Sequence, residues 1–341
     1  MPHLHRPRPS QEEAAIGALT GLALGDALGM PTQSLPRARI RDRFGRIEGL
    51  LDGPDDQPIA PGMPAGSITD DTEQALLLAE LVIAGDGQVD PHRFAEALIA
   101  WEQDMIRRGS RDLLGPSTKV ALEKLQAGVP VEETGRFGTT NGAAMRIAPV
   151  GIAHAPGTGL LEAVVTASEV THRTGLGISG AAAVAATVSA AVDGADTDQA
   201  LDSAVSAAAQ GAHLGNWVAG ASIPDRFTAF RAPLRAMAPR ERDAFLYDVV
   251  GTSVQSQESV VAALLLVDLG RSDPFATLCL AASLGGDTDT VAAMAGAMLG
   301  ALHGPEAFPS TAVQQVLEVN RLDLAPVARQ LLAVRAGATR P

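Results

Sequence analysis

Apolar residues recur at helical spacing along most of the chain, with polar residues between them. Ser10 and Glu13 have the spacing of a capping box, and an apolar face follows from Ile16 to Ala27, so the pattern predicts a helix that begins here. Comparable patterns predict further helices at 76–81, 94–106, 119–125, 143–150, 160–170, 178–192, 200–211, 256–269 and 291–302.

The segment 31–64 breaks this periodicity. It is rich in Pro, Gly and Asp, so we expect a long irregular loop, and long loops in compact domains are often functional. We find no alternating strand pattern of useful length, no internal repeat and no linker between two cores. The sequence therefore predicts one all-α domain over 10–333, with flexible tails at 1–9 and 334–341.

Small residues mark how the helices are expected to pack. Ala292, Gly296 and Gly300 are spaced four apart, and such a stripe lets another helix approach closely. Hydrophobic residues make up 46% of the chain but aromatic residues only 3%, which favours a core of packed helices over sheets. The single cysteine, Cys279, lies in an apolar run and is expected to be a buried thiol.

The charge balance excludes some partners. A formal net charge of -13 and a pI near 4.9 give no broad attraction for nucleic acid or anionic membrane surfaces. The uncharged stretch 174–192 consists mostly of small residues, so we expect a buried core helix rather than a membrane span. No apolar secretory segment follows residues 1–9, and a cytoplasmic location is therefore expected.

Two short acidic clusters carry the candidate chemistry. Each adjoins a threonine and precedes a helical pattern: Thr69, Asp70 and Asp71 in the first, and Asp287, Asp289 and Thr290 in the second. Gly285 and Gly286 give the second cluster backbone freedom. Four carboxylates and two hydroxyls form a hard oxygen set that suits Mg²⁺, Mn²⁺ or Ca²⁺ better than zinc, and four aspartates balance two divalent ions. The alternative is structural, because Thr and Asp are ordinary residues of helix caps and first turns.

Several motifs, in this order, resemble the ADP-ribosylglycohydrolase family: Gly21 to Gly29 with Asp26, the 69–72 cluster, Asn141 to Arg146, Thr171 with His172, and Gly286 to Thr290. The resemblance implies an orthogonal multi-helix fold with a binuclear Mg²⁺ or Mn²⁺ centre. It places the metal ligands on the six cluster residues, with Asp70 and Asp289 close to both ions and catalytic. It also implies hydrolysis of the glycosidic bond at the ribose anomeric carbon of an ADP-ribosylated protein or small molecule.

The resemblance further suggests residues that contact the substrate. Asn141, Gly142 and Gly286 are expected to line the ribose and phosphate pocket, where backbone N–H groups can face oxygen anions. His172 is expected to donate to a ribose or phosphate oxygen. The structural alternatives are a plain turn at Asn141 and a core histidine, since a lone His in an apolar helix usually has protein partners.

Two charged residues lie beside these motifs. Asp26 can hydrogen-bond the groups that hold the metal, or it can cap a neighbouring turn. Arg146 can be an internal salt-bridge partner rather than a ligand of the substrate.

Gln33 departs from the family pattern, which commonly has a substrate-facing Glu at this point. Because Gln cannot act as a general base, either Asp112 manages the protons or the substrate differs from protein-linked ADP-ribose. Asp112 can also be a solvated loop carboxylate. An N-glycosidase of smaller ribosyl compounds, such as nucleosides, and a non-catalytic binding or structural homologue therefore stay as alternatives. The intact clusters argue against the last of these.

Overall fold

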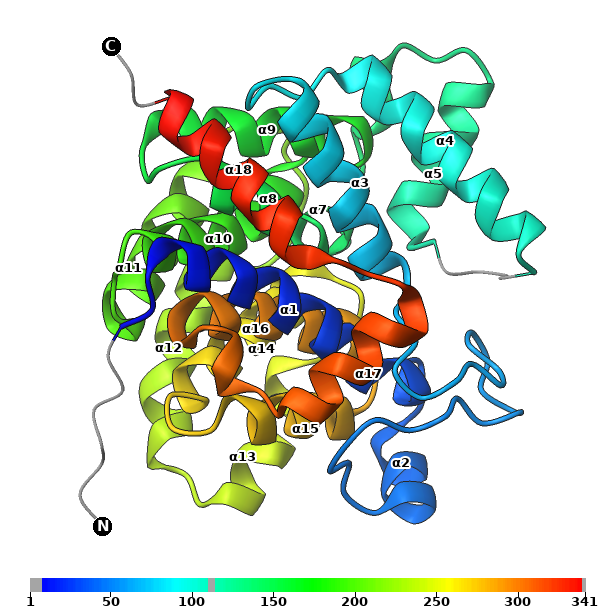
Figure 1. Cartoon of the computed structure of the whole chain (residues 1–341), viewed down its shortest axis with the longest axis vertical. Helices are drawn as coiled ribbons and strands as arrows, with labels where there is room; N and C mark the ends of the chain where they lie inside the picture. The colour runs from blue at the N-terminus through cyan, green and yellow to red at the C-terminus, as the bar shows by residue number, and fades with distance from the viewer. Residues whose placement is uncertain (1–7, 110–113, 339–341) are drawn as a thin grey trace.

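The computed structural model describes residues 8–109 and 114–338, and helices make up most of this part (Figure 1). The first helices are α1 (Gln11–Gly29), α2 (Arg37–Phe44), α3 (Asp70–Ala84), α4 (Pro91–Arg107), α5 (Pro116–Gln126), α6 (Val131–Thr134), α7 (Gly142–Met145), α8 (Ala148–Ala153) and α9 (Thr158–His172). The others are α10 (Gly175–Val192), α11 (Thr197–Gly211), α12 (Ile223–Ala236), α13 (Pro239–Phe245), α14 (Ser256–Leu269), α15 (Pro274–Leu284), α16 (Thr288–His303), α17 (Ser310–Asn320) and α18 (Leu324–Ala338).

Three short helical turns complete the set: η1 (Met30–Thr32), η2 (Leu246–Val250) and η3 (Pro305–Ala307). Over the described residues β-pairing is limited to isolated bridges, such as the one between Leu35 and Gly286. The predicted all-α class is therefore confirmed.

Helices α1 and α16 pack backbone to backbone at the centre of the molecule (Figure 1). Ser10 caps α1 through the predicted reciprocal hydrogen bonds with Glu13. A Cβ atom added to Gly21 would lie 2.0 Å from the carbonyl oxygen of Gly296, so neither helix has room for a side chain here. The close packing expected from the small-residue stripe is thus present, and it brings the end of α1 to the start of α16.

Two long apolar helices occupy the core. The segment Gln11–Thr32 and helix α10 are long and apolar enough to cross a membrane by length and composition, but 94% of an apolar 18-residue stretch of the first and 100% of the second are buried inside the protein. The expectation of a buried core helix at 174–192 is met. Cys279 is also buried, as expected.

The predicted boundaries need three corrections. The segment 31–64 is not wholly irregular, because it contains α2, whose single buried residue, Ile40, leaves no apolar face to recognise. The helix expected at 143–150 is divided into α7 and α8, and Pro149 lies in the first turn of the second helix. The last residues before the C-terminus are not a loose tail from 334 onward, because α18 continues to Ala338.

Arg335 explains why α18 extends so far. Its side chain is 5% exposed, and its guanidinium donates to the carbonyl of Ile152 at 3.1 Å and to the carboxylate of Asp193 at 2.6 Å. Burial of a charged group with these partners ties the helix to the domain. Of the predicted N-terminal tail, residues 1–7 lie outside the described residues.

Candidate active site

The two acidic clusters begin two helices that meet. Thr69 precedes α3 and Asp287 precedes α16, yet neither side chain makes a capping hydrogen bond. Instead the Thr290 hydroxyl donates to Asp71 Oδ2 at 3.3 Å, across 219 positions of the sequence. Thr69 Oγ1 lies 3.2 Å from the same oxygen. The clusters therefore come together as predicted, and the capping alternative is wrong for Thr69 and Asp287.

Asp26, on α1, forms hydrogen bonds with residues of the first cluster. Its carboxylate accepts hydrogen bonds from the backbone N–H groups of Thr69 and Thr72, at 3.0 and 3.1 Å, and from their hydroxyls, at 2.8 and 2.5 Å. Asp26 is fully buried, and burial raises its pKa to about 6. The sequence indicated a supporting role for Asp26 as one of two options, and it placed Thr72 in the 69–72 motif, but the contact between Thr72 and Asp26 was not predicted.

The backbone before the second cluster follows a path that requires glycine. Gly285 and Gly286 have φ values of +95° and +78°, in the left-handed region that glycine tolerates. A Cβ atom on Gly29, at the end of α1, would lie 2.4 Å from the Cα of Asp289. The chain after α1 therefore borders the second cluster directly.

Gln33 lies on this bordering segment. The N–H of the next residue, Ser34, donates to the carbonyl of Gly286 at 2.7 Å. The Gln33 side chain is 5% exposed, and its Nε2 has no hydrogen-bond partner within residues 8–109 and 114–338. Leaving a buried donor unpaired is unfavourable, so this amide is suited to a ligand oxygen.

The carboxylates of the centre are buried together. Burial, followed by the charges of the neighbouring aspartates, raises the pKa values of Asp70, Asp71 and Asp289 well above the ordinary range, and burial also raises that of Asp287. Asp71 Oδ1 and Asp289 Oδ1 are buried without a hydrogen-bond partner among the described residues. Buried carboxylates in this state need a proton or a cation.

The same groups could hold divalent cations. Thr69, Thr290 and the four aspartates offer oxygen donors only, which suit Mg²⁺ or Mn²⁺. In the part of the chain that the structure covers, no group of three His, Cys, Asp or Glu side chains already has the close arrangement of a metal site. The donor chemistry and the two unpartnered oxygens fit such ions, and the ligand roles themselves stay predictions.

The turn before α7 reaches the second cluster. Asn141 Nδ2 donates to Asp287 Oδ2 at 2.5 Å and to the hydroxyl of Ser259 at 3.0 Å. The contact with Ser259 was not foreseen. A Cβ atom on Gly142 would lie 2.8 Å from Cε1 of His172, so this turn rests directly on the imidazole ring.

His172 is completely buried beneath that turn. Its Nδ1 lies 2.7 Å from Thr171 Oγ1 and its Nε2 lies 2.9 Å from Thr140 Oγ1. Burial and the positive charge of Arg146 hold the pKa of His172 well below its usual range. Both ring nitrogens thus have protein partners, as expected for the alternative in which His172 is a core histidine. Asp112, the other predicted proton-handling residue, lies outside the described residues.

Arg146 is a buried cation behind the first cluster. Its guanidinium donates to Gln74 Oε1 at 3.0 Å and to Thr171 Oγ1 at 2.5 Å, and it lies 4.8 Å from the centre of the Phe94 ring. Burial lowers its pKa to about 9, and the charge of Asp70 opposes this change. Among the described residues Arg146 makes hydrogen bonds in place of the suggested salt bridge.

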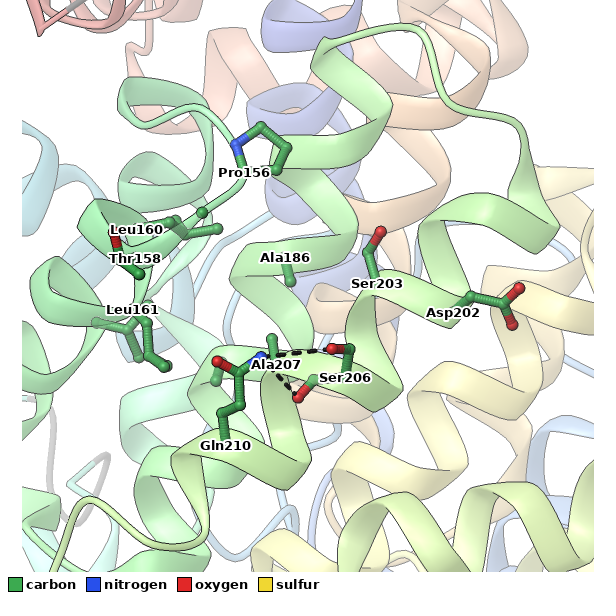
Figure 2. Close-up of a pocket in the computed structure, with 13 residues that line it drawn as sticks. Pro156, Thr158, Leu160, Leu161, Ala186, Asp202, Ser203, Ser206, Ala207 and Gln210 are labelled. Atoms are coloured by element: carbon green, nitrogen blue, oxygen red, sulfur yellow. Dashed lines mark hydrogen bonds between the residues drawn. The ribbon is translucent and has the colours of Figure 1, made fainter.

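A cavity lies apart from these groups. It has a volume of about 470 Å³ and lies between α9, α10 and α11, where Leu160, Leu161, Ala186 and Ala207 form much of its wall (Figure 2). Asp202, Ser203 and Gln210 contribute polar atoms at its edge. None of the site residues predicted from the sequence lines this cavity.

The fold and the site define an all-helical protein whose centre is a buried, oxygen-rich group of carboxylates between two helix starts. The ADP-ribosylglycohydrolase family model matches residues 7–341, and the chain belongs to this family of hydrolases. The family resemblance seen in the sequence motifs is therefore confirmed.

Individual relatives agree with this assignment. The chain is 36% identical to the uncharacterised protein YegU of Escherichia coli (strain K12), over 95% of this chain and 97% of that protein. It is 28% identical to an ADP-ribosyl-[dinitrogen reductase] glycohydrolase of Rhodospirillum rubrum, over 89% and 90% of the two chains. A solved structure described as an ADP-ribosylglycohydrolase-related protein complex matches with a TM-score of 0.69 and 25% identity, over 95% of this chain and 99% of that one.

Proposed function

We propose that this protein hydrolyses the glycosidic bond at the ribose anomeric carbon of an ADP-ribosylated protein or small molecule, with the help of two divalent cations, Mg²⁺ or Mn²⁺. The observation that carries the proposal is the meeting of Asp71 and Thr290, which unites two oxygen-rich clusters. The names of two relatives also support it: the R. rubrum glycohydrolase and an ADP-ribosylarginine hydrolase of Pseudomonas putida (strain GB-1).

The six cluster residues would hold the cations: Thr69, Asp70, Asp71, Asp287, Asp289 and Thr290. Four carboxylates match the charge of two divalent ions, and the unpartnered oxygens of Asp71 and Asp289 would gain the cationic partner that buried carboxylates require. Such ions, when bound, orient substrate oxygens and lower the pKa of bound water.

The chain's own residues would prepare the site for this chemistry. Asp26 fixes the start of α3 by accepting hydrogen bonds from Thr69, and Asn141 fixes Asp287 by donating to it. The unpartnered amide of Gln33 would donate to a substrate oxygen. Because an amide cannot accept a proton near neutral pH, proton transfer is assigned to a carboxylate: Asp70, Asp289 or Asp112.

Gln33 also favours a second candidate function, the hydrolysis of a smaller ribosyl compound such as a nucleoside. Gln33 places a neutral amide beside the acidic centre, where the family commonly has a carboxylate. This difference suits a substrate whose leaving group does not need a carboxylate beside it. The chemistry at the ribose would be the same, and only the leaving group would differ.

Product release separates these functions. The purified protein, with Mg²⁺ or Mn²⁺, is incubated with ADP-ribosylated arginine and serine peptides and, separately, with a panel of nucleosides. We expect free ADP-ribose from at least one of the peptides. Asp289→Asn should slow this release by roughly a hundredfold or more, since it removes charge stabilisation worth several kcal/mol, whereas Asp323→Asn, at an exposed aspartate of the same charge, should not.

The other outcomes are equally informative. Release of free base from a nucleoside, without release of ADP-ribose from any peptide, would establish the second function and overturn the hydrolysis of ADP-ribosylated arginine and serine side chains. An absence of product from every substrate would favour a binding or structural protein.

A further inference from the structure

The segment that carries Gln33 is a tight turn. The N–H of Leu35 donates to the carbonyl of Thr32 at 3.2 Å, which closes a four-residue β-turn. Gln33 has a φ of -57° and a ψ of 143°, and Ser34 has a φ of +60°. These angles define a type II turn, whose third residue needs a positive φ and is usually Gly or Asn. A serine at this position is therefore strained.

A serine would fit a type I turn without this strain. A type I turn is closed by the same hydrogen bond between its first and last residues, but its third residue has a negative φ, which serine adopts readily. The two forms differ mainly by a flip of the peptide group between the second and third residues. In this turn that group consists of the Gln33 carbonyl and the Ser34 N–H, so contacts to these atoms decide which form is stable.

Both sides of that peptide group are held in the type II form. The Ser34 N–H donates to the carbonyl of Gly286 at 2.7 Å, next to the second acidic cluster. The Gln33 carbonyl accepts a hydrogen bond from Gln57 Nε2 at 2.9 Å. A flip would turn each group away from its partner and break both hydrogen bonds. The first of these joins two backbone groups, whereas the second depends on a side chain and can be removed by substitution.

The amide of Gln57 fits this place in one orientation. Its Nε2 faces the carbonyl groups of Gln33 and Met30, and its Oε1 accepts hydrogen bonds from the backbone N–H groups of Ile59 and Ala60. Exchanging the two amide atoms would place oxygen against carbonyl oxygens and NH₂ against N–H groups. The side chain is 3% exposed, so water does not compete for these contacts.

We propose that Gln57 is a positioning residue, which holds the 32–35 turn in the strained type II form and so keeps Gln33 beside Gly286 and the acidic centre. The Gln33 side chain, whose buried Nε2 has no hydrogen-bond partner among the described residues, is thereby fixed in place before a ligand binds. The effect on ligand binding rests on the proposed function, whereas the form of the turn does not.

The form of the turn can be observed in solution. In a type II turn the Hα of the second residue lies close to the N–H of the third, whereas in a type I turn the N–H groups of these two residues lie close together. Nuclear Overhauser effects at the Ser34 N–H, assigned by their loss in Ser34→Ala, distinguish the two forms. We expect the type II contact in the unmodified protein, and the type I contact there would overturn the proposal.

Gln57→Met removes the hydrogen bond to the turn and keeps nearly the same volume. The turn should change to type I, and the affinity for ADP-ribose, measured by calorimetry, should fall about tenfold. Asp52→Ala is the control, because it removes another anchor of the same loop, the contact with the N–H of Ala65 at 2.7 Å, and should keep both the turn and the affinity. An equal loss in the two variants, or an unchanged turn in Gln57→Met, would refute the positioning role.

Ser34→Gly separates a positioning role from a merely structural one. Glycine adopts a positive φ without strain, so the type II form should no longer depend on Gln57. When Gln57→Met is combined with Ser34→Gly, the loss of affinity relative to Ser34→Gly alone should shrink from about tenfold to about twofold or less. A loosened loop would not be repaired in this way, and a loss of full size in the double variant would overturn the proposal.

Ser34→Val tests the same strain if Gln57→Met does not fold. The position is exposed, and a β-branched residue strongly disfavours a positive φ, so the turn should become type I and the affinity should fall. An unchanged turn and affinity in this variant would refute the proposal. If the unmodified protein has the type II turn but no affinity for ADP-ribose, the proposed function fails, while the form of the turn in the variants still decides the role of Gln57.

Discussion

Thr290 donates a hydrogen bond to Asp71 across 219 positions of the sequence, and this contact joins the starts of α16 and α3. Helix N-termini favour negative charge, which helps to hold the carboxylates there. Such partial charges do not compensate for the burial of several like-charged groups. Arg146 provides one buried cation near Asp70, so the centre as a whole is expected to be stabilised by added cations.

Mg²⁺ or Mn²⁺ is therefore expected to raise the melting temperature of the purified protein. At a free concentration of about one hundred times the dissociation constant, a ligand that binds only the folded state stabilises it by about 2.7 kcal/mol. Asp289→Ala should abolish the increase, because it removes a carboxylate whose Oδ1 is buried without a partner. The measurement is a thermal melt with and without each ion.

Asp323→Asn is the control for this experiment, because it removes one negative charge from an exposed position that belongs to neither cluster. It should show the full increase in melting temperature. If neither ion changes the melting temperature of the unmodified protein, or if both variants respond alike, the two clusters do not form the cation site.

Because α1 and α16 are in close contact, the stability of the protein should depend strongly on side-chain size at this interface. In Gly21→Ala the new methyl group would lie 2.0 Å from the carbonyl oxygen of Gly296, so the helices must separate and the protein should lose about 3 kcal/mol of stability. Gly159→Ala, in α9, is the matched control, since a Cβ atom added there would meet no other part of the protein within 4 Å, and it should gain up to about 1 kcal/mol. Urea unfolding measures both changes, and a similar loss in both variants would contradict the packing argument.

The sequence was sufficient to predict long core helices such as α1, α10 and α14, and to single out the two clusters, but it did not predict α12, α15 or α18, which also pack against the core. Capping at Ser10 and the stripe through Gly296 are local patterns, and each has one structural solution. Asp70 and Asp289 could be paired because hard oxygen donors share a preference for the same ions. The balance of four aspartates against two divalent ions and the order of the family motifs supported this pairing. Helical periodicity alone says nothing about contacts between distant segments.

The remaining features depend on contacts between distant segments. Helix α2 buries only Ile40, so its sequence resembles a polar loop, and the end of α18 depends on the hydrogen bonds of Arg335 to distant carbonyls. The environment of His172 could not be deduced either, because its partners are hydroxyls brought together by folding. Polar residues such as Thr140 give no periodic signal that would reveal such a network.

Gln33→Met is expected to separate ligand binding from stability. Met has nearly the same volume as Gln but lacks the amide that is buried without a partner, so the free energy of unfolding should stay the same or rise slightly. The affinity for ADP-ribose should fall about tenfold, since one donor to the ligand is lost. Calorimetry and urea unfolding give the two values, and a loss of stability with unchanged affinity would show that Gln33 has a structural role.

The stability of the protein should fall with decreasing pH in a way that depends on His172. Because burial holds the pKa of this ring well below its ordinary value of 6.5, the unfolded chain takes up a proton below pH 6.5 that the folded chain does not. The contribution of His172 is thus fully present above pH 6.5 and is lost at about 1.4 kcal/mol per pH unit below it. His172→Gln should remove this part of the slope, measured by urea unfolding at several pH values. His213→Gln, at an exposed histidine, should keep it, and identical slopes in the unmodified protein and His172→Gln would mean that the ring is protonated in the folded state.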